Sequence, residues 1–254
     1  MNELGAAEFM FEVEERTVDL KELPLQQTLG QRSDSDPGHK VILRPDTGEI
    51  IAVVRKSYRL IPNEDLIMQF YTELRDRQIP AFLDYSHSYV TNRQMRLQIT
   101  IPELTFEDGD SEITLCIFLH NSYDGSEKVR IVFGATRIIC TNGMVLTESL
   151  TEYSFKHQAG VNIEAIVSRA ISSVFDEWPI VEDKVKLLAM TPFEVETYER
   201  VEKLMGKDWV TYLRSRKPET MWGAYNELTG YISGQLLKED RAIHQRRVSA
   251  VFDL

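Results

Sequence analysis

The densest group of chemically able side chains in this 254-residue chain is the run His-Asn-Ser-Tyr-Asp-Gly-Ser at residues 120–126. Within it, His120, Asn121 and Asp124 form a loop of candidate function. His120 could serve as a general base while Asp124 orients its ring or binds a metal, as in a hydrolase or nuclease. No third ligand or activated nucleophile lies nearby in the sequence, which favours a turn whose polar side chains satisfy backbone groups. We therefore assign no catalytic residue and lean away from an enzyme.

Basic side chains on predicted strands form a second candidate site. Arg and Lys lie on or beside successive strands, with Tyr89 and Tyr123 nearby. A single strand of nucleic acid requires cations for its phosphates and aromatic rings on which its bases stack. The alternative is an ordinary solvated face balanced by Asp and Glu, because antiparallel sheets commonly expose one polar face. The candidate nucleic-acid-binding residues are Arg93, Arg96, Lys128, Arg130 and Arg137.

Other common sites have no counterpart in the sequence. It contains neither a glycine-rich loop ending in Gly-Lys-Ser/Thr nor a Gly-x-Gly-x-x-Gly motif. Its five histidines lack the spacing of metal ligands. Cys116 and Cys140 lie in apolar surroundings and are expected to be reduced core thiols. We predict no metal and no cofactor.

The net charge of −11 disfavours nucleic-acid binding unless the acidic residues are segregated. Residues 1–36 contain nine acids and three bases, and residues 103–112 contain five acids and no base. These two segments account for the whole net charge, so a basic surface elsewhere is allowed. Solvated loops or tails explain such runs most simply. Alternatively, the two segments could bind a basic protein partner.

Period-two patterns predict an antiparallel meander of three strands. Apolar and polar residues alternate over 89–101 and 113–119, and a third run follows at 128–140. A hairpin around residues 45–48 and a helix starting at Asn63 come before them.

The spacing of apolar residues becomes helical after Gly160, where an apolar stripe runs from Ile163 to Phe175. Thr191 begins a sequence typical of a capping box, and residues 218–247 could form one long helix. The fold class predicted is therefore α+β, an antiparallel sheet with one early helix, followed by a helical C-terminal segment. We expect three regions: an acidic flexible arm over 1–38, a β-rich core over 39–160, and a helical segment over 161–254 that packs on or extends the core.

The longest stretch without Asp, Glu, Lys or Arg covers residues 113–123. It is far shorter than the roughly 20 apolar residues that a membrane-spanning helix needs. The acidic N-terminus also lacks the basic region and apolar core of a secretory signal. We expect a cytoplasmic protein that makes no membrane contact.

Four motifs occur in order along the chain: DTGE at 46–49, HNSYDGS at 120–126, RIICTNG at 137–143 and WGAYNELT at 222–229. Together they resemble the phage- and plasmid-borne proteins grouped as domain of unknown function 932. The resemblance spans residues 40 to about 235 and implies a mobile-element gene that works near DNA metabolism or host defence. It carries no settled activity. A more distant analogy is to Rad52-like single-strand annealing proteins, which also combine a curved antiparallel sheet with helices.

The leading hypothesis is a non-enzymatic, homo-oligomeric mobile-element protein that binds single-stranded nucleic acid and promotes annealing or recombination. In this hypothesis the basic residues neutralise phosphates and the acidic arm limits non-specific contact. Two alternatives stay open. One is an interaction protein with a host or phage protein partner, such as an inhibitor of host defence. The other is a hydrolase that uses His120 and Asp124.

Overall fold

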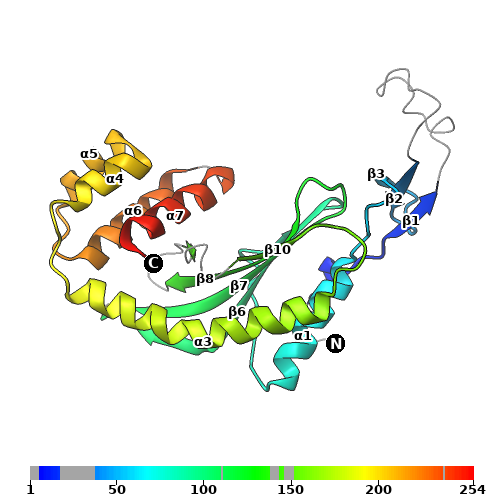
Figure 1. Ribbon diagram of the computed structural model, residues 1–254, viewed down its shortest axis with the longest axis horizontal. Helices are drawn as coiled ribbons and strands as arrows, with labels where there is room; N and C mark the ends of the chain where they lie inside the picture. The colour runs from blue at the N-terminus through cyan, green and yellow to red at the C-terminus, as the bar shows by residue number, and fades with distance from the viewer. Residues whose placement is uncertain (1–5, 18–37, 110, 138–142, 146–151, 237) are drawn as a thin grey trace.

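The structure is a computed structural model that describes residues 6–17, 38–109, 111–137, 143–145, 152–236 and 238–254 (Figure 1). It confirms the α+β class, with antiparallel sheets, one early helix and a helical C-terminal segment. The strands are β1 (Glu14–Thr17), β2 (His39–Leu43), β3 (Ile50–Arg55), β4 (Phe82–Leu83), β5 (Tyr89–Val90), β6 (Gln94–Glu107), β7 (Glu112–Ser122), β8 (Val129–Arg137), β9 (Gly143–Val145) and β10 (Glu152–Phe155). The helices are η1 (Ala6–Phe9), α1 (Asn63–Asp76), α3 (Ile163–Met190), α4 (Thr197–Met205), α5 (Lys207–Arg216), α6 (Met221–Gln235) and α7 (Lys238–Phe252).

Two antiparallel sheets organise the chain. The small sheet has the order β1-β2-β3, and the large one has the order β10-β8-β7-β6-β4, with β5 also pairing with β6 and β9 with β8. The predicted meander is the β6-β7-β8 centre of the large sheet. In Figure 1, β1–β3 lie at one end of the large sheet and α4–α7 at the other.

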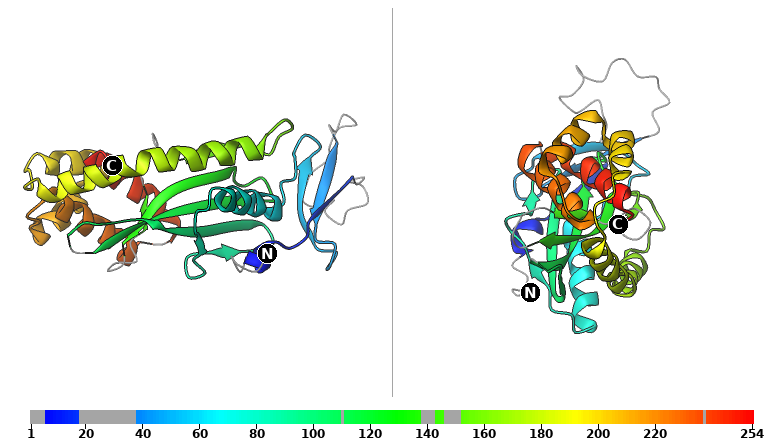
Figure 2. Two further views of the ribbon diagram at one scale, coloured as in Figure 1. Left: turned by 90° about the horizontal axis from the view of Figure 1, so that it is seen from below. Right: turned by 90° about the vertical axis from the view of Figure 1, so that its left-hand side faces the viewer.

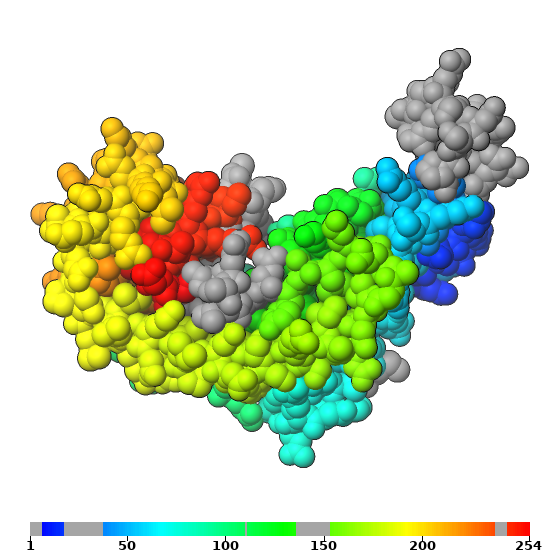
Figure 3. Space-filling view, in the orientation of Figure 1, coloured from blue at the N-terminus to red at the C-terminus, as the bar shows by residue number. Residues whose placement is uncertain are grey.

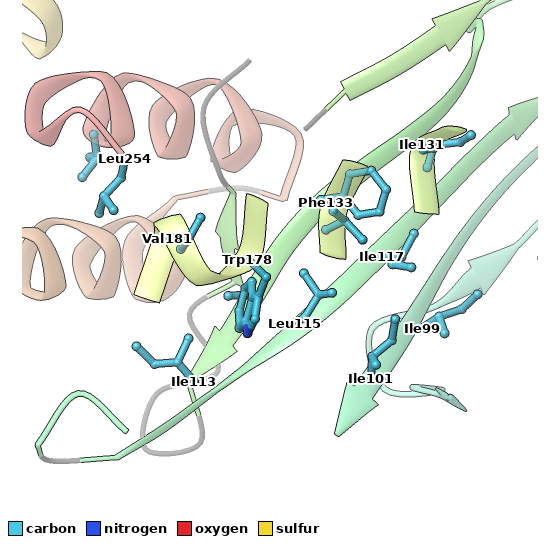
Figure 4. Packing of buried hydrophobic residues seen from close by; sticks show 14 of the residues in the cluster. Ile99, Ile101, Ile113, Leu115, Ile117, Ile131, Phe133, Trp178, Val181 and Leu254 are labelled. Carbon is cyan, nitrogen blue, oxygen red and sulfur yellow. The ribbon is translucent and has the colours of Figure 1, made fainter. Parts of the chain in front are cut away.

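One face of the large sheet forms the main hydrophobic core. Ile99, Ile117 and Phe133 are directly opposite one another on β6, β7 and β8, and each is at most 1% exposed. Trp178 and Val181 of α3 belong to the same cluster (Figure 4). Because successive strand residues point to opposite faces, this packing leaves the alternate positions on the other face.

Helix α3 covers the core face. The predicted stripe is confirmed, since α3 buries four of its members, Val167, Ala170, Ile171 and Val174. Asn162 caps the helix by accepting a hydrogen bond from the Ala165 amide at 2.9 Å. Figure 2 (left) shows α3 along one side of the sheet, and Figure 3 shows it covering the sheet from the viewer's side. The opposite face of the sheet therefore lies on the far side of Figure 3.

The N-terminal segment differs from the predicted flexible arm over 1–38. Residues 6–17 form η1 and β1, and β1 pairs with β2. Phe9 is 2% exposed within the main core, and Phe11 packs edge-on against Tyr123 with ring centroids 5.8 Å apart. These apolar anchors outweigh the acidic composition that suggested an arm. Residues 1–5 and 18–37 lie outside the described part of the chain.

The acidic segment 103–112 was expected to be a solvated loop, but part of it belongs to the hairpin formed by β6 and β7. β6 continues to Glu107 and β7 begins at Glu112, with a register shift between Ile101 and Thr105. Phe106 is buried and contacts Trp178 at a centroid distance of 5.3 Å. Asp108 accepts a 2.7 Å hydrogen bond from the indole nitrogen of Trp222. One of the acids therefore ties the hairpin to α6.

Two helix predictions were wrong. Thr191 ends α3 instead of capping the next helix, because its carbonyl accepts from the Met221 amide at 3.0 Å and the chain there runs extended beside the start of α6. The expected long helix over 218–247 is divided into α6 and α7. Leu236 has an extended backbone, which lets the chain reverse so that α7 packs back on α6.

Cys116 is a buried thiol that accepts from the Gln98 side chain at 3.5 Å, and Cys140 lies outside the described residues. No helix among the described residues is long and apolar enough to cross a bilayer.

Tyr58 and His157 join the two sheets. Their rings stack with centroids 4.6 Å apart, and the Tyr58 hydroxyl donates to the Ser122 carbonyl at 2.8 Å. The His157 Nδ1 donates to the Arg59 carbonyl at 3.2 Å, while its Nε2 is buried and has no hydrogen-bond partner among the described residues. Burial lowers the pKa of His157, against the opposing effect of the Arg59 carbonyl. A proton on Nε2 would be a buried donor with no acceptor.

This geometry predicts that acid destabilises the fold. Since the folded pKa of His157 lies below its ordinary value of 6.5, the unfolded chain binds the proton first as pH falls. The stabilisation is complete above that value and is lost below it, by at most about 1.4 kcal/mol per pH unit. His157→Phe keeps the ring stack and should flatten the decline in unfolding free energy between about pH 7 and 5, measured by urea denaturation. An unchanged slope would contradict this role.

Candidate nucleic-acid interface

Three candidate residues from three strands lie side by side on the face of the large sheet opposite the core. Arg96 of β6 is directly opposite His120 of β7, which is directly opposite Arg130 of β8. Directly opposed residues of antiparallel strands share a face. We call Arg96, His120 and Arg130 the arginine row. Its members are partly buried, whereas their neighbours on the core face are fully buried.

Glu127 joins the two ends of the arginine row. The Arg96 Nη2 lies 3.2 Å from Glu127 Oε1, and the Arg130 Nη2 lies 3.2 Å from Glu127 Oε2. The Arg130 Nη2 also lies 3.1 Å from His120 Nδ1, and the same ring nitrogen lies 3.8 Å from Glu127 Oε2. One carboxylate thus balances two guanidinium groups, and the imidazole of His120 lies between them.

The charges of the site follow from these contacts. The adjacent His120 ring and the guanidinium groups of Arg130 and Arg96 lower the pKa of Glu127 to about 2 against the opposing effect of burial, so Glu127 is ionised at neutral pH. Burial lowers the pKa of His120, and Arg130 and Arg96 lower it further, while Glu127 raises it. The row and Glu127 together therefore carry a net charge of about +1 at neutral pH.

The arrangement favours binding over catalysis. The hydroxyl of Ser122, two residues after His120, donates to the Glu127 carbonyl at 2.9 Å and accepts from the Glu127 amide at 3.1 Å. It closes the loop and is not activated by His120. Across the described residues, no group of three His, Cys, Asp or Glu side chains could hold a metal ion. Cationic donors on a sheet face are suited to an anionic ligand.

The structure separates the three residues of the predicted loop. His120 and Asn121 lie in β7, because its ladder with β6 extends to Ser122, so their assignment to a loop is corrected. Asn121 points to the core side and donates to the Ile61 carbonyl and the Asn63 side chain at 2.9 and 2.8 Å. Asp124 is in the turn, where it accepts from the Ser126 amide at 2.9 Å. The acid beside His120 is Glu127.

The other basic candidates flank the row. Arg93 and Lys128 are exposed, and neither has a carboxylate partner among the described residues. Arg93 precedes β6 and Lys128 precedes β8. The backbone of Arg137 pairs with Ile113 at the far end of β8, and its side chain lies outside the described part of the chain.

Two exposed aromatic side chains in the β4–β5 segment at the β6 edge, Phe82 and Tyr85, were missed in the sequence, whereas Tyr89 was named. Tyr89 lies opposite Arg96, whose guanidinium is 5.6 Å from the ring centroid, and is 41% exposed. Phe82 lies opposite Thr100 on the same face and is 59% exposed, and Tyr85 between them is 52% exposed. The sequence signal for exposed rings was that residues 82–89 contain three aromatic residues without the regular spacing that would bury one face of a helix or strand. Glu127 was also missed, because only the register places it beside both arginines.

Comparison with known proteins is limited to one family model. No curated protein and no solved structure matches the chain. The model described as domain of unknown function (DUF932) matches residues 50–217, which run from β3 to the residue after α5 and include the arginine row. The match is shorter than the resemblance predicted from motifs and stops before the WGAYNELT sequence of α6. Because it covers more than half of the sequence, the chain belongs to the DUF932 family.

Proposed function

We propose that the protein binds a single strand of nucleic acid on the face of its large sheet opposite the main core. The observation that carries the proposal is the register that brings Arg96 and Arg130 into one row beside the exposed ring of Tyr89. The exposed ring of Phe82 lies farther along the same edge, opposite Thr100. Phosphates would lie along the row and bases would stack on the rings, which is how sequence-tolerant single-strand binders work.

Binding by stacking and phosphate contacts depends little on the base sequence. Such contacts suit a protein that holds arbitrary complementary strands, as annealing in recombination requires. We therefore include in the proposal an annealing or recombination role in a phage or plasmid, carried out by a homo-oligomer. A phage or host protein partner would act on the bound strand.

Removing both arginines should weaken binding. Arg96→Gln with Arg130→Gln should lower affinity for a single-stranded oligonucleotide about tenfold at moderate salt, because two phosphate contacts are lost. The slope of log affinity against log salt should fall by about 1.4. Fluorescence anisotropy over a salt series measures both quantities. Arg169→Gln with Lys203→Gln removes two exposed helix cations and should have little effect. Equal losses in the two double variants would reject the site.

Ring stacking at the sheet edge gives an independent test. Tyr89→Ala with Phe82→Ala should weaken binding about tenfold or more, since stacking contributes about 1–3 kcal/mol per base. Tyr89→Phe keeps the ring and should bind as the wild type does. Both side chains are exposed, so melting temperature should change little. If Tyr89→Phe and the alanine double variant bind equally well in the same anisotropy assay, the rings do not contact bases.

Glu127 competes with phosphate in this account, so its neutralisation should have opposite effects on stability and binding. Glu127→Gln should bind the oligonucleotide several-fold more tightly, because both guanidinium groups lose their internal counterion. It should also be less stable at pH 7 by about 1 kcal/mol, a value reduced for solvent screening. Because the folded pKa is about 2 against an ordinary 4.5, that stability difference should shrink as pH falls through this window. Weaker binding by this variant would contradict competition.

A further inference from the structure

Exposed cations also gather at the junction between the two sheets, outside the arginine row. Three segments meet there at Tyr58. They are the linker after β3, the turn between β7 and β8, and the linker after β10. The Tyr58 hydroxyl donates to the Ser122 carbonyl at 2.8 Å, and its ring lies 3.7 Å from the position of a Cβ on Gly125. The ring also stacks on His157 at 4.6 Å. Each segment is therefore held by direct contact with one side chain.

Backbone hydrogen bonds fix the same junction. The Arg59 amide donates to the His157 carbonyl at 3.0 Å, and the Lys56 amide donates to the Gly38 carbonyl at 3.1 Å. The Arg59 guanidinium donates to the Val161 carbonyl at 2.9 Å. The positions of the linkers are thus set by buried and backbone contacts, while the cationic side chains at the junction are exposed.

The charged side chains at the junction are mostly positive. The five cations are exposed, and none has a carboxylate partner among the described residues. Asp124 in the turn is the acid that acts on Tyr58. In a chain of net charge −11, exposed cations that have no carboxylate partner among the described residues need a reason. At the arginine row, by contrast, one carboxylate, Glu127, balances two arginines. The junction cations are Arg55, Lys56, Arg59, Lys128 and Lys156.

The junction is continuous with the proposed interface. Lys128 is two residues before Arg130, a separation of about 7 Å along an extended chain. Glu127 in this turn contacts the arginine row, and the carbonyl of Ser122, the last residue of β7, accepts from Tyr58. A polyanion that lies along the arginine row and continues past the turn would therefore reach the junction next.

We infer that the junction cations form a second phosphate-binding surface that extends the path of a bound nucleic-acid strand beyond the sheet face. The inference rests on the proposed function of the arginine row. The contacts at the junction would be to phosphates alone, because Tyr58 and His157 stack on one another and are not exposed. The junction should therefore add affinity for long strands, with strong salt dependence and without base preference.

Oligonucleotides of two lengths test this inference. The probes are thymidine oligomers of about 6 and about 30 nucleotides, the shorter within the usual range for one binding fold. Arg55→Gln, Lys56→Gln and Lys156→Gln, combined in the full chain, should weaken binding of the long oligomer several-fold and lower its salt slope by about 2. Binding of the short oligomer should be unchanged. The matched control combines Arg169→Gln, Lys203→Gln and Arg247→Gln, three exposed helix cations.

The outcomes separate the two proposals. Equal binding of the long oligomer by the junction variant and the wild type would overturn the inference, and loss of affinity in the Arg96→Gln, Arg130→Gln variant would then still support the sheet face. An equal loss in the junction variant and the matched control would also overturn it, because general charge would explain the effect. If the wild type binds neither oligomer, the proposed function and the inference both fail.

Discussion

The alternation of side chains along β6, β7 and β8 is the constraint on which this structure depends. Three long antiparallel strands point every second residue to the same side, and α3 covers the side on which isoleucine, leucine and phenylalanine fall. The intervening residues then have to lie on the other face. A shift of one residue in register would bury Arg96 and expose Leu97, so the core that stabilises the sheet also assembles the arginine row.

The charge balance of the row explains how an acidic protein can present a site for an anion. Glu127 holds two guanidinium groups at 3.2 Å in the free protein, which avoids leaving two partly buried cations uncompensated. The same carboxylate would oppose phosphate binding, so affinity depends on what lies around the row. Exposed rings on one side and unpaired cations on the other supply that surrounding surface, and the strongly acidic hairpin lies at the opposite end of β6.

Local patterns predicted much of the fold. Period-two alternation located β6–β8, and helical spacing located the buried stripe of α3. The N-terminal strand was missed because β1 is short and acidic and is defined by its pairing with β2. At the site, strand alternation predicted Arg96 and Arg130, but pairing of His120 with Glu127 instead of Asp124 depends on cross-strand register. No local pattern encodes that register, nor the exposure of Phe82.

The face bearing the arginine row is proposed to contact nucleic acid directly. Ultraviolet crosslinking of a halogenated-uracil oligonucleotide to the full chain, followed by mass-spectrometric mapping, locates the contact without any substitution. Crosslinks on Tyr89, Phe82 or Tyr85 are expected, since Tyr89 lies opposite Arg96 and the other two exposed rings lie in the β4–β5 segment on the same edge of the sheet. Crosslinks confined to α4–α7, or none at saturating oligonucleotide, would contradict the account.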